Sequence, residues 1–127
     1  MKSFSKSWKS SKKVKKQRKY RYNAPKHIKR KFLSSNLSKG LREKYNTRSF
    51  KLKKGDKVKI MRGQFKGKAS KVDRVDLKKS KVYLEGIGFD KRDGSKSFYP
   101  ISPSNLMITE LILDDKMRQK AIKRKSK

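Results

Sequence analysis

The strongest constraint on this chain is the charge of its N-terminal third. The first fifty residues contain eighteen Lys or Arg side chains and one acidic side chain, Glu43. Over all 127 residues, 41 basic groups face 10 acidic ones, so the formal net charge is +31. Self-repulsion of that size destabilises a compact monomer. We therefore expect a polyanionic partner, and the densest polyanion in a cell is nucleic acid.

Composition limits the size of the folded core. Only 31% of the residues are hydrophobic and 40% are charged, which suits one small globule but not the whole length. We expect a compact core with basic extensions that become ordered on a partner. Cysteine is absent, which excludes disulfides and cysteine-based zinc sites. We find no secretory signal and no apolar run of about 20 residues, so we expect a soluble, intracellular protein.

The N-terminal segment, residues 1–22, is a basic extension rich in Lys and Ser. It shows no apolar period, so we expect it to be disordered in isolation. Within it, the cluster from Lys12 to Lys19 also matches a nuclear localisation patch. An RNA-binding tail and a nuclear signal are compatible if the source is eukaryotic, so both interpretations stay open.

Residues 23–49 are predicted to form two short helices. The first, over 25–33, follows the helix-entry signal Asn23-Ala24-Pro25 and pairs a narrow apolar stripe with a basic face. The second, over 36–45, has apolar residues at every fourth position. Asn46 is the expected stop of this second helix.

Residues 50–113 change to the pattern of a mainly β fold. Short runs with alternating apolar side chains and tight turns predict five strands, and five strands in so short a segment predict a small barrel. The expected strands lie over 57–61, 72–75, 81–87, 98–101 and 106–113, with a hairpin turn over 91–94. In residues 114–127, Asp114-Asp115 is expected to cap a short basic C-terminal helix.

A glycine-bounded loop between the first two predicted strands is the densest local signal. The strand Lys54-Gly55-Asp56-Lys57-Val58-Lys59-Ile60 leads into the loop Arg62-Gly63-Gln64-Phe65-Lys66-Gly67, and Lys68 follows. The two loop glycines allow positive φ or a close backbone approach, and the cations at the tip can neutralise a phosphate. The alternative is a structural hairpin whose lysines are merely solvated. The total charge favours nucleic acid.

This loop resembles a KOW motif, a unit of some ribosomal proteins and transcription elongation factors. Further similarity is carried by Tyr22-Asn23-Ala24-Pro25, the basic helix over 28–31, Ser34-Ser35-Asn36-Leu37-Ser38, Leu41-Arg42-Glu43-Lys44-Tyr45, Phe98-Tyr99-Pro100-Ile101 and Pro103-Ser104-Asn105-Leu106-Met107-Ile108-Thr109. Over about residues 20–120 the chain is similar to the large-subunit ribosomal protein family called L twenty-four in bacteria and L twenty-six in eukaryotes, in its archaeal–eukaryotic branch. Ser70 departs from the pattern, because many members carry a third loop glycine there.

The resemblance implies an SH3-like five-stranded barrel bound to large-subunit rRNA. It also implies a place near the exit of the peptide tunnel, a role in early subunit assembly and neighbouring ribosomal proteins as partners. The expected location is then the cytoplasmic ribosome, with passage through the nucleolus if the source is eukaryotic.

The residues expected to bind rRNA are cations, loop glycines and two tyrosines. They are Lys12, Lys13, Lys15, Lys16, Arg18, Tyr20, Arg21, Tyr22, His27, Lys29, Arg30, Lys31, Arg42, Lys54, Arg62, Gly63, Lys66, Gly67 and Lys68. Aromatic residues in the tail, Trp8, Tyr20 and Tyr22, can stack on unpaired bases or instead pack on protein. In Tyr20-Arg21-Tyr22 we expect the guanidinium to hold a phosphate between two rings.

An enzyme is not expected, because no nucleophile, base and orienting group fall together. We also expect no cofactor, metal site, membrane partner or small-molecule substrate, since His27 is the only histidine and lacks partners for a ligand set. Two other functions remain open. One is a KOW-type regulatory module that contacts a polymerase or a transcript, and the other is a DNA-compacting architectural protein.

Overall fold

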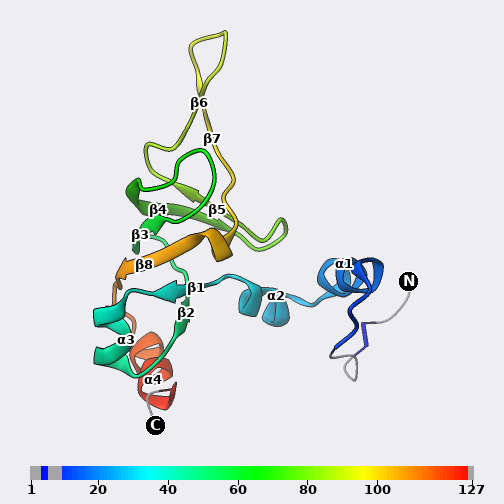
Figure 1. Ribbon diagram of the computed structural model, residues 1–127, viewed down its shortest axis with the longest axis vertical. Coiled ribbons are helices and arrows are strands. Elements are labelled where there is room, and N and C mark those ends of the chain that lie inside the picture. Colours follow the sequence, from blue (N-terminus) through cyan, green and yellow to red (C-terminus); the bar gives the residue numbers. More distant parts are fainter. Residues whose placement is uncertain (1–3, 6–9, 126–127) are drawn as a thin grey trace.

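A computed structural model gives the fold of residues 4–5 and 10–125. Strands occupy the middle of the molecule, a hairpin projects at one end, and α1 and α2 extend to the side (Figure 1). Trp8, for which base stacking was considered, lies outside the described residues, as do residues 1–3, 6–7 and 9 of the predicted extension. The elements in chain order are α1 (Val14–Asn23), α2 (Lys26–Phe32), β1 (Ser34–Leu37), α3 (Lys39–Tyr45), β2 (Ser49–Lys51), β3 (Lys57–Ile60), β4 (Ala69–Asp76), β5 (Lys81–Leu84), β6 (Gly88–Asp90), β7 (Lys96–Phe98), the 3-10 turn η1 (Pro103–Asn105), β8 (Leu106–Glu110) and α4 (Lys116–Lys125).

One six-stranded sheet organises the molecule, in the order β2-β1-β8-β3-β4-β5. Its neighbours pair antiparallel except β1 and β8, which are parallel. β6 and β7 form a separate two-stranded hairpin. The expectation of a mainly β small domain with flanking helices is confirmed. The closed five-stranded barrel is not, because β1 and β2 extend the sheet and no pairing joins β2 to β5 within the described residues.

In strand β3, every second residue is apolar and buried, as the sequence pattern predicts. Val58 and Ile60 are buried while Lys57 and Lys59 point to solvent. Val72 from β4 and Ile108 from β8 join them in one core cluster. Burial of each such side chain contributes about 1.5–3 kcal/mol, so this alternating stripe holds the neighbouring strands together.

The predicted 98–101 strand is shorter in the structure, whereas the turn before it is confirmed. β7 ends at Phe98, and beyond Pro100 only Ile101 pairs, in an isolated bridge to Val82. Proline cannot donate to a ladder, which explains the interruption. In the expected hairpin turn, Gly94 has φ of 79° and donates its N–H to the Lys91 carbonyl at 3.0 Å.

The second predicted helix is wrong at its beginning. Leu37 lies in β1, where it is buried and pairs with Ile108, so α3 begins only after Ser38. The prediction placed Leu37 and Leu41 in one helix because they are four residues apart, but Leu37 is a buried strand residue and only the half-buried Leu41 belongs to the helix. The expected stop at Asn46 is confirmed, because this residue adopts the left-handed conformation with φ of 47°. The first helix, over Lys26–Phe32, agrees with the prediction to within a residue at each end.

The prediction that the basic extension lacks regular structure is wrong for Val14–Asn23, which forms α1. None of its residues is buried. Lys, Arg and Gln have favourable helix propensities, so a helix can form without the apolar stripe that the prediction required. An aromatic contact joins the extension to α2: the Tyr20 ring lies 4.9 Å from Phe4 and 6.1 Å from Phe32, centroid to centroid.

A buried ion pair fastens α4 to the sheet. Arg118 donates from Nη1 to Asp56 Oδ1 at 2.8 Å and from Nη2 to Asp56 Oδ2 at 2.6 Å. Asp56 also accepts the backbone N–H groups of Lys53 and Ile112. The Asp56 side chain is fully buried, so its charge depends on these donors. As expected, Asp115 caps α4, because its Oδ1 accepts the Met117 N–H at 2.8 Å.

Among the described residues, no helix has both the length and the apolar character required to cross a membrane.

Ser70, which stands where many family members have a third loop glycine, lies inside β4 opposite Val58. Only Asn46 and Ser80 among the described non-glycine residues have positive φ. The Ser70 position therefore requires no glycine in this chain.

Replacing Arg118 with Met should destabilise the fold by about 3–5 kcal/mol, because the Asp56 carboxylate would stay buried without its partner. Urea denaturation, followed by circular dichroism, measures this. The matched control is Glu110→Gln, which breaks the exposed Lys57–Glu110 pair of 2.7 Å and should change stability by less than about 1 kcal/mol. If both variants lowered the free energy of unfolding by the same small amount, the buried pair would not be needed for stability.

Candidate nucleic-acid interface

The loop between β3 and β4 is closed by its own backbone. Ile60 donates its N–H to the Lys68 carbonyl at 2.9 Å, and Gly67 donates to the Ile60 carbonyl at 2.8 Å. Lys66 donates to the Gly63 carbonyl at 3.1 Å. Gly63 and Gly67 have φ of 95° and 90°, a conformation that side chains with a Cβ rarely adopt. The predicted special backbone of this loop is therefore present, and it makes the loop tight.

Three exposed cations project from this loop. Arg62, Lys66 and Lys68 are all exposed, and none of them pairs with an acid among the ion pairs of the described residues. The Lys68 ammonium lies 5.4 Å from the centroid of the Phe65 ring, which orients its stem. Phe65 in turn packs on Tyr99, centroid to centroid 5.3 Å. Positive charge is thus displayed on a supported loop.

A groove of about 420 Å³ brings Arg62 together with Arg42 of α3. Both arginines were predicted to bind rRNA, although twenty positions separate them. They meet because β1, which leads into α3, lies beside β8, which lies beside β3. The remaining lining residues are Asn36, Met61, Ser104, Asn105, Leu106 and Met107.

The groove offers hydrogen-bond chemistry suited to a nucleic-acid backbone. Arg42 donates from Nε to the Leu37 carbonyl at 2.7 Å, which orients its guanidinium and leaves the two terminal nitrogens as further donors. Guanidinium groups bind phosphates through paired N–H donors. Ser104 and Asn105 add hydroxyl and amide groups that can meet a ribose 2′-OH. A second guanidinium, that of Arg62, lines the same space.

Sequence reasoning did not assign Asn36, Ser104 or Asn105 to the site. All three were used for the family resemblance, and Asn36 was also placed at the beginning of the second predicted helix. Their placement depends on tertiary pairing: Met61 donates its N–H to the Asn105 carbonyl at 2.8 Å, and Ser35 Oγ donates to the Pro103 carbonyl at 2.6 Å. The polar run Pro103-Ser104-Asn105 before a buried strand was the available signal.

The predicted cations of the N-terminal region form a second, separate basic surface on α1 and α2. Most of these side chains are exposed, and Lys29 and Tyr20 are half-buried. The exposed members of the predicted set are Lys12, Lys13, Lys15, Lys16, Arg18, Arg21, Tyr22, His27, Arg30 and Lys31. Because α1 and α2 extend away from the strands, this surface does not join the loop groove within the described structure (Figure 1).

The expected clamp of Tyr20, Arg21 and Tyr22 is not formed. Residues two apart on a helix point to different sides, so the two rings do not enclose the guanidinium. Tyr20 packs on Phe4 and Phe32, and the Arg21 guanidinium lies 5.9 Å from the centroid of the Phe32 ring. Tyr22 alone presents its ring, with 82% of its surface exposed. Of the two tyrosines, Tyr22 is therefore the one available for stacking on an unpaired base.

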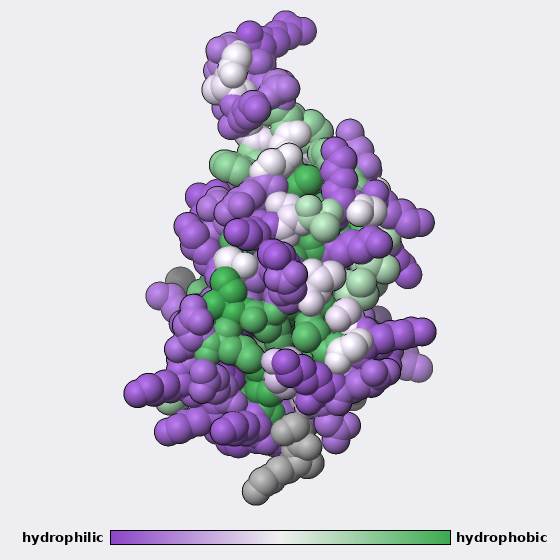
Figure 2. Space-filling model, turned by 90° about the vertical axis from the view of Figure 1, so that its left-hand side faces the viewer, coloured by the Kyte–Doolittle hydropathy of each residue, from purple (hydrophilic) through white to green (hydrophobic). Residues whose placement is uncertain are grey.

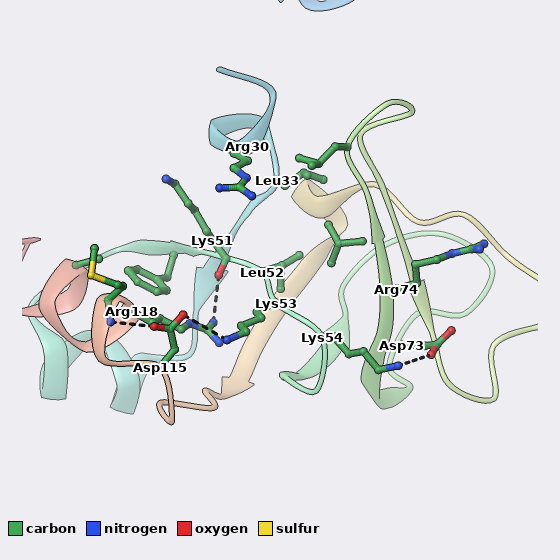
Figure 3. A pocket seen from close by; sticks show the side chains of 15 residues that line it. Arg30, Leu33, Lys51, Leu52, Lys53, Lys54, Asp73, Arg74, Asp115 and Arg118 are labelled. Atoms are coloured by element: carbon green, nitrogen blue, oxygen red, sulfur yellow. Dashed lines mark hydrogen bonds and ion pairs between the residues drawn. The ribbon is translucent and has the colours of Figure 1, made fainter. Parts of the chain in front are cut away.

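Arg30 of α2, which belongs to the surface just described, also lines a different hollow of about 730 Å³ together with the predicted residue Lys54 (Figure 3). The Lys54 ammonium is 3.6 Å from the Asp73 carboxylate. These two side chains are thus separated from the loop cations, and the predicted set divides into three places: the loop groove, the N-terminal helices and this hollow.

Three aspartates, Asp76, Asp93 and Asp115, accept local hydrogen bonds that lower the pKa of each. Two backbone N–H groups, of Lys79 first and then Lys78, hold the pKa of Asp76 below its usual value. The Ser95 hydroxyl lowers the pKa of Asp93 in the hairpin turn, and the Met117 N–H lowers the pKa of Asp115. None of these three acids lines the loop groove.

Hydrophilic side chains cover most of the face in Figure 2, with apolar ones gathered in its lower half.

Comparison with known proteins agrees with this geometry. The model of the family that comprises the eukaryotic ribosomal proteins L26 and their archaeal L24 counterparts matches residues 11–125. A relative from the archaeon Methanosphaera stadtmanae, the large ribosomal subunit protein uL24, is 49% identical over 115 residues, which cover 91% of this chain and 98% of the relative. This chain belongs to the family of the eukaryotic L26 and archaeal L24 ribosomal proteins.

Proposed function

We propose that this chain is a structural constituent of the large ribosomal subunit that binds and stabilises rRNA. The observation that carries the proposal is the groove in which Arg42 and Arg62 line the same space beside the tight glycine loop. The name of the archaeal relative, a large ribosomal subunit protein, supports it. Binding would proceed through phosphate neutralisation and shape, because A-form RNA offers its phosphates and 2′-OH groups rather than its base edges.

The cationic surfaces take separate parts in this proposal. Arg62, Lys66, Lys68 and Arg42 hold one stretch of rRNA backbone, and α1 with α2 reaches a second stretch. The resemblance to the family supports a position near the exit of the peptide tunnel, a role in early subunit assembly and contacts with neighbouring ribosomal proteins. The cellular location that follows is the ribosome in the cytoplasm, with nucleolar assembly in a eukaryotic source.

Co-sedimentation tests this function directly. A tagged full-length chain should migrate with large subunits at moderate salt and stay bound after washing. A regulatory KOW module would mostly wash off under the same conditions, and absence of the chain from large subunits would overturn the proposal. Competition separates the architectural alternative, since duplex DNA should displace bound rRNA poorly if the chain recognises folded RNA.

Affinity for an rRNA fragment should fall steeply with ionic strength. If about ten phosphates are neutralised, the log–log slope has a magnitude near 5–10, and a magnitude below about 2 would contradict a charge-driven interaction. Fluorescence anisotropy across a salt series measures this slope for the full-length chain.

Arg62→Gln should weaken binding to the same fragment and lower the slope by about one, because one phosphate contact is lost. Lys78→Gln is the matched control. Lys78 is exposed in the turn that follows β4, so this change removes the same charge away from the groove. If the two variants lose affinity equally, RNA binding is not focused on the loop groove.

Deleting residues 1–23 should weaken RNA binding and leave the sheet folded. These residues carry ten Lys or Arg side chains and no acid, and α1 buries none of its residues. We expect a free energy of unfolding within about 1 kcal/mol of the full chain, because changes at exposed positions usually have small effects on stability. Loss of the cooperative urea transition would instead show that the extension is part of the folded core.

A further inference from the structure

The hollow of about 730 Å³ has an apolar floor between α2, β2, β4 and α4. Its floor and walls include Leu33, Leu52, Val75, Leu77, Met117 and Ala121. In Figure 3, Arg118 and Asp115 lie on one side and Asp73 and Arg74 on the other, with Leu33 and Leu52 between them. We call this space the α2–α4 groove. Its volume is in the range of sites that bind a ligand or a short segment.

The rim of the α2–α4 groove carries excess positive charge. Besides the buried Arg118, five cations line it, namely Arg30, Lys51, Lys53, Lys54 and Arg74, together with the acids Asp73 and Asp115. Both acids are already paired, Asp73 with Lys54 at 3.6 Å and Asp115 with Lys53 at 3.4 Å. Arg30, Lys51 and Arg74 have no acidic partner among the ion pairs of the described residues. The Arg74 guanidinium lies 4.5 Å from the centroid of the Tyr83 ring, so Arg30 and Lys51 are the rim cations most available to a partner.

The walls of this groove are preformed. Leu52 donates its N–H to the Leu33 carbonyl at 3.0 Å, which joins the segment after α2 to the segment after β2. The Arg118–Asp56 pair holds α4 against the opposite wall. Met117 stands at the mouth with 67% of its surface exposed, and methionine adapts its shape to a partner. Because the floor of the groove is already formed, binding a partner would cost this chain little conformational entropy.

RNA phosphates could neutralise the cations of the rim, but neither phosphates nor stacked bases would cover the aliphatic floor. Bases bind proteins through stacking on open aromatic faces. The one aromatic ring lining the groove, Phe50, is 4% exposed, and the Arg118 guanidinium and the Lys125 ammonium lie 5.5 and 5.6 Å from its centroid. The remaining floor is aliphatic and suits apolar side chains, whose burial is favourable.

Two other occupants are excluded by charge. Residues 1–22 of the chain contain no acid, so the N-terminal extension would be repelled by the rim. A second copy of the chain, with a formal charge of +31, would meet the same repulsion. The rim and the floor together require a segment that is apolar on one face and acidic beside it.

We propose that the α2–α4 groove binds an acidic, apolar segment of another protein. Its aliphatic side chains lie on Val75, Leu77 and Met117, which are partly exposed, and its Asp or Glu carboxylates reach Arg30 and Lys51. Arg30 then serves this protein contact rather than rRNA. The inference does not depend on RNA binding at the loop groove, because the residues that carry it are different.

A designed peptide pair tests the proposal on the full-length chain. The probe is a fluorescent peptide of about twelve residues with Leu at helical spacing and Glu elsewhere, and the control is a permuted peptide of the same composition without the stripe. At a salt concentration that suppresses nonspecific charge attraction, the striped peptide should bind at least about tenfold more tightly, since only it can bury two or more leucines on the floor. Equal binding of the two peptides overturns the proposal.

The matched variants are Met117→Glu in the groove and Val14→Glu on α1. The two side chains have nearly equal exposure, 67% and 69%, so both changes replace an exposed apolar group by the same acid. Met117→Glu should remove most of the preference for the striped peptide, and Val14→Glu should change it by less than about twofold, the size of a surface effect. Equal losses in both variants contradict the proposal.

A photoreactive amino acid separates this inference from the proposed function. Placed at Met117 in chains assembled into large subunits, it should cross-link to a protein segment rich in Asp or Glu and apolar residues. Placed at the exposed loop residue Gln64, it should cross-link to RNA. Cross-linking of Met117 only to RNA overturns the groove proposal, whereas failure of Gln64 to reach RNA counts against the proposed function instead.

Discussion

The ion pair between Asp56 and Arg118 joins parts of the fold that are sixty-two residues apart in sequence. Asp56 precedes β3, and Arg118 lies in α4, so the contact fixes the C-terminal helix on the strand-rich centre. The same carboxylate accepts N–H groups from the segments before β3 and after β8. A buried carboxylate requires such complete pairing, because leaving it without a partner would be strongly destabilising. The α4 wall of the apolar groove depends on it as well.

The positive charge of the chain is gathered in three separate groups of cations rather than spread evenly over the surface. One group of cations surrounds the tight β3–β4 loop, another lies along α1 and α2, and a third surrounds the apolar α2–α4 groove. The acids with lowered pKa values lie in turns and at a helix cap, where the Ser95 hydroxyl stabilises the ionised form of Asp93 and backbone N–H groups stabilise those of Asp76 and Asp115. Attraction to a polyanion and attraction to an acidic protein segment can therefore operate on different faces of one small domain.

Sequence reasoning succeeded where a pattern is local. The alternation around Val58 and Ile60, the glycines of the loop and the cap at Asp115 are all found as predicted. It failed where a residue is decided by distant partners: Leu37 matched a helical spacing but is buried beside Ile108 in a parallel pairing. Helix α1 was missed for another reason, since it buries no face and therefore leaves no apolar period.

Net charge, the glycine loop, the absence of cysteine and the family resemblance were determined by the sequence alone, because each is a property of composition or of neighbouring residues. The tertiary structure decided which side chains meet. The parallel placement of β1 beside β8 brings Arg42 to Arg62, and the docking of α4 places Met117 in the same groove as Leu52. Neither placement has a local signature, because hydrogen bonds between strands distant in sequence, and a buried ion pair, decide which residues line the same groove.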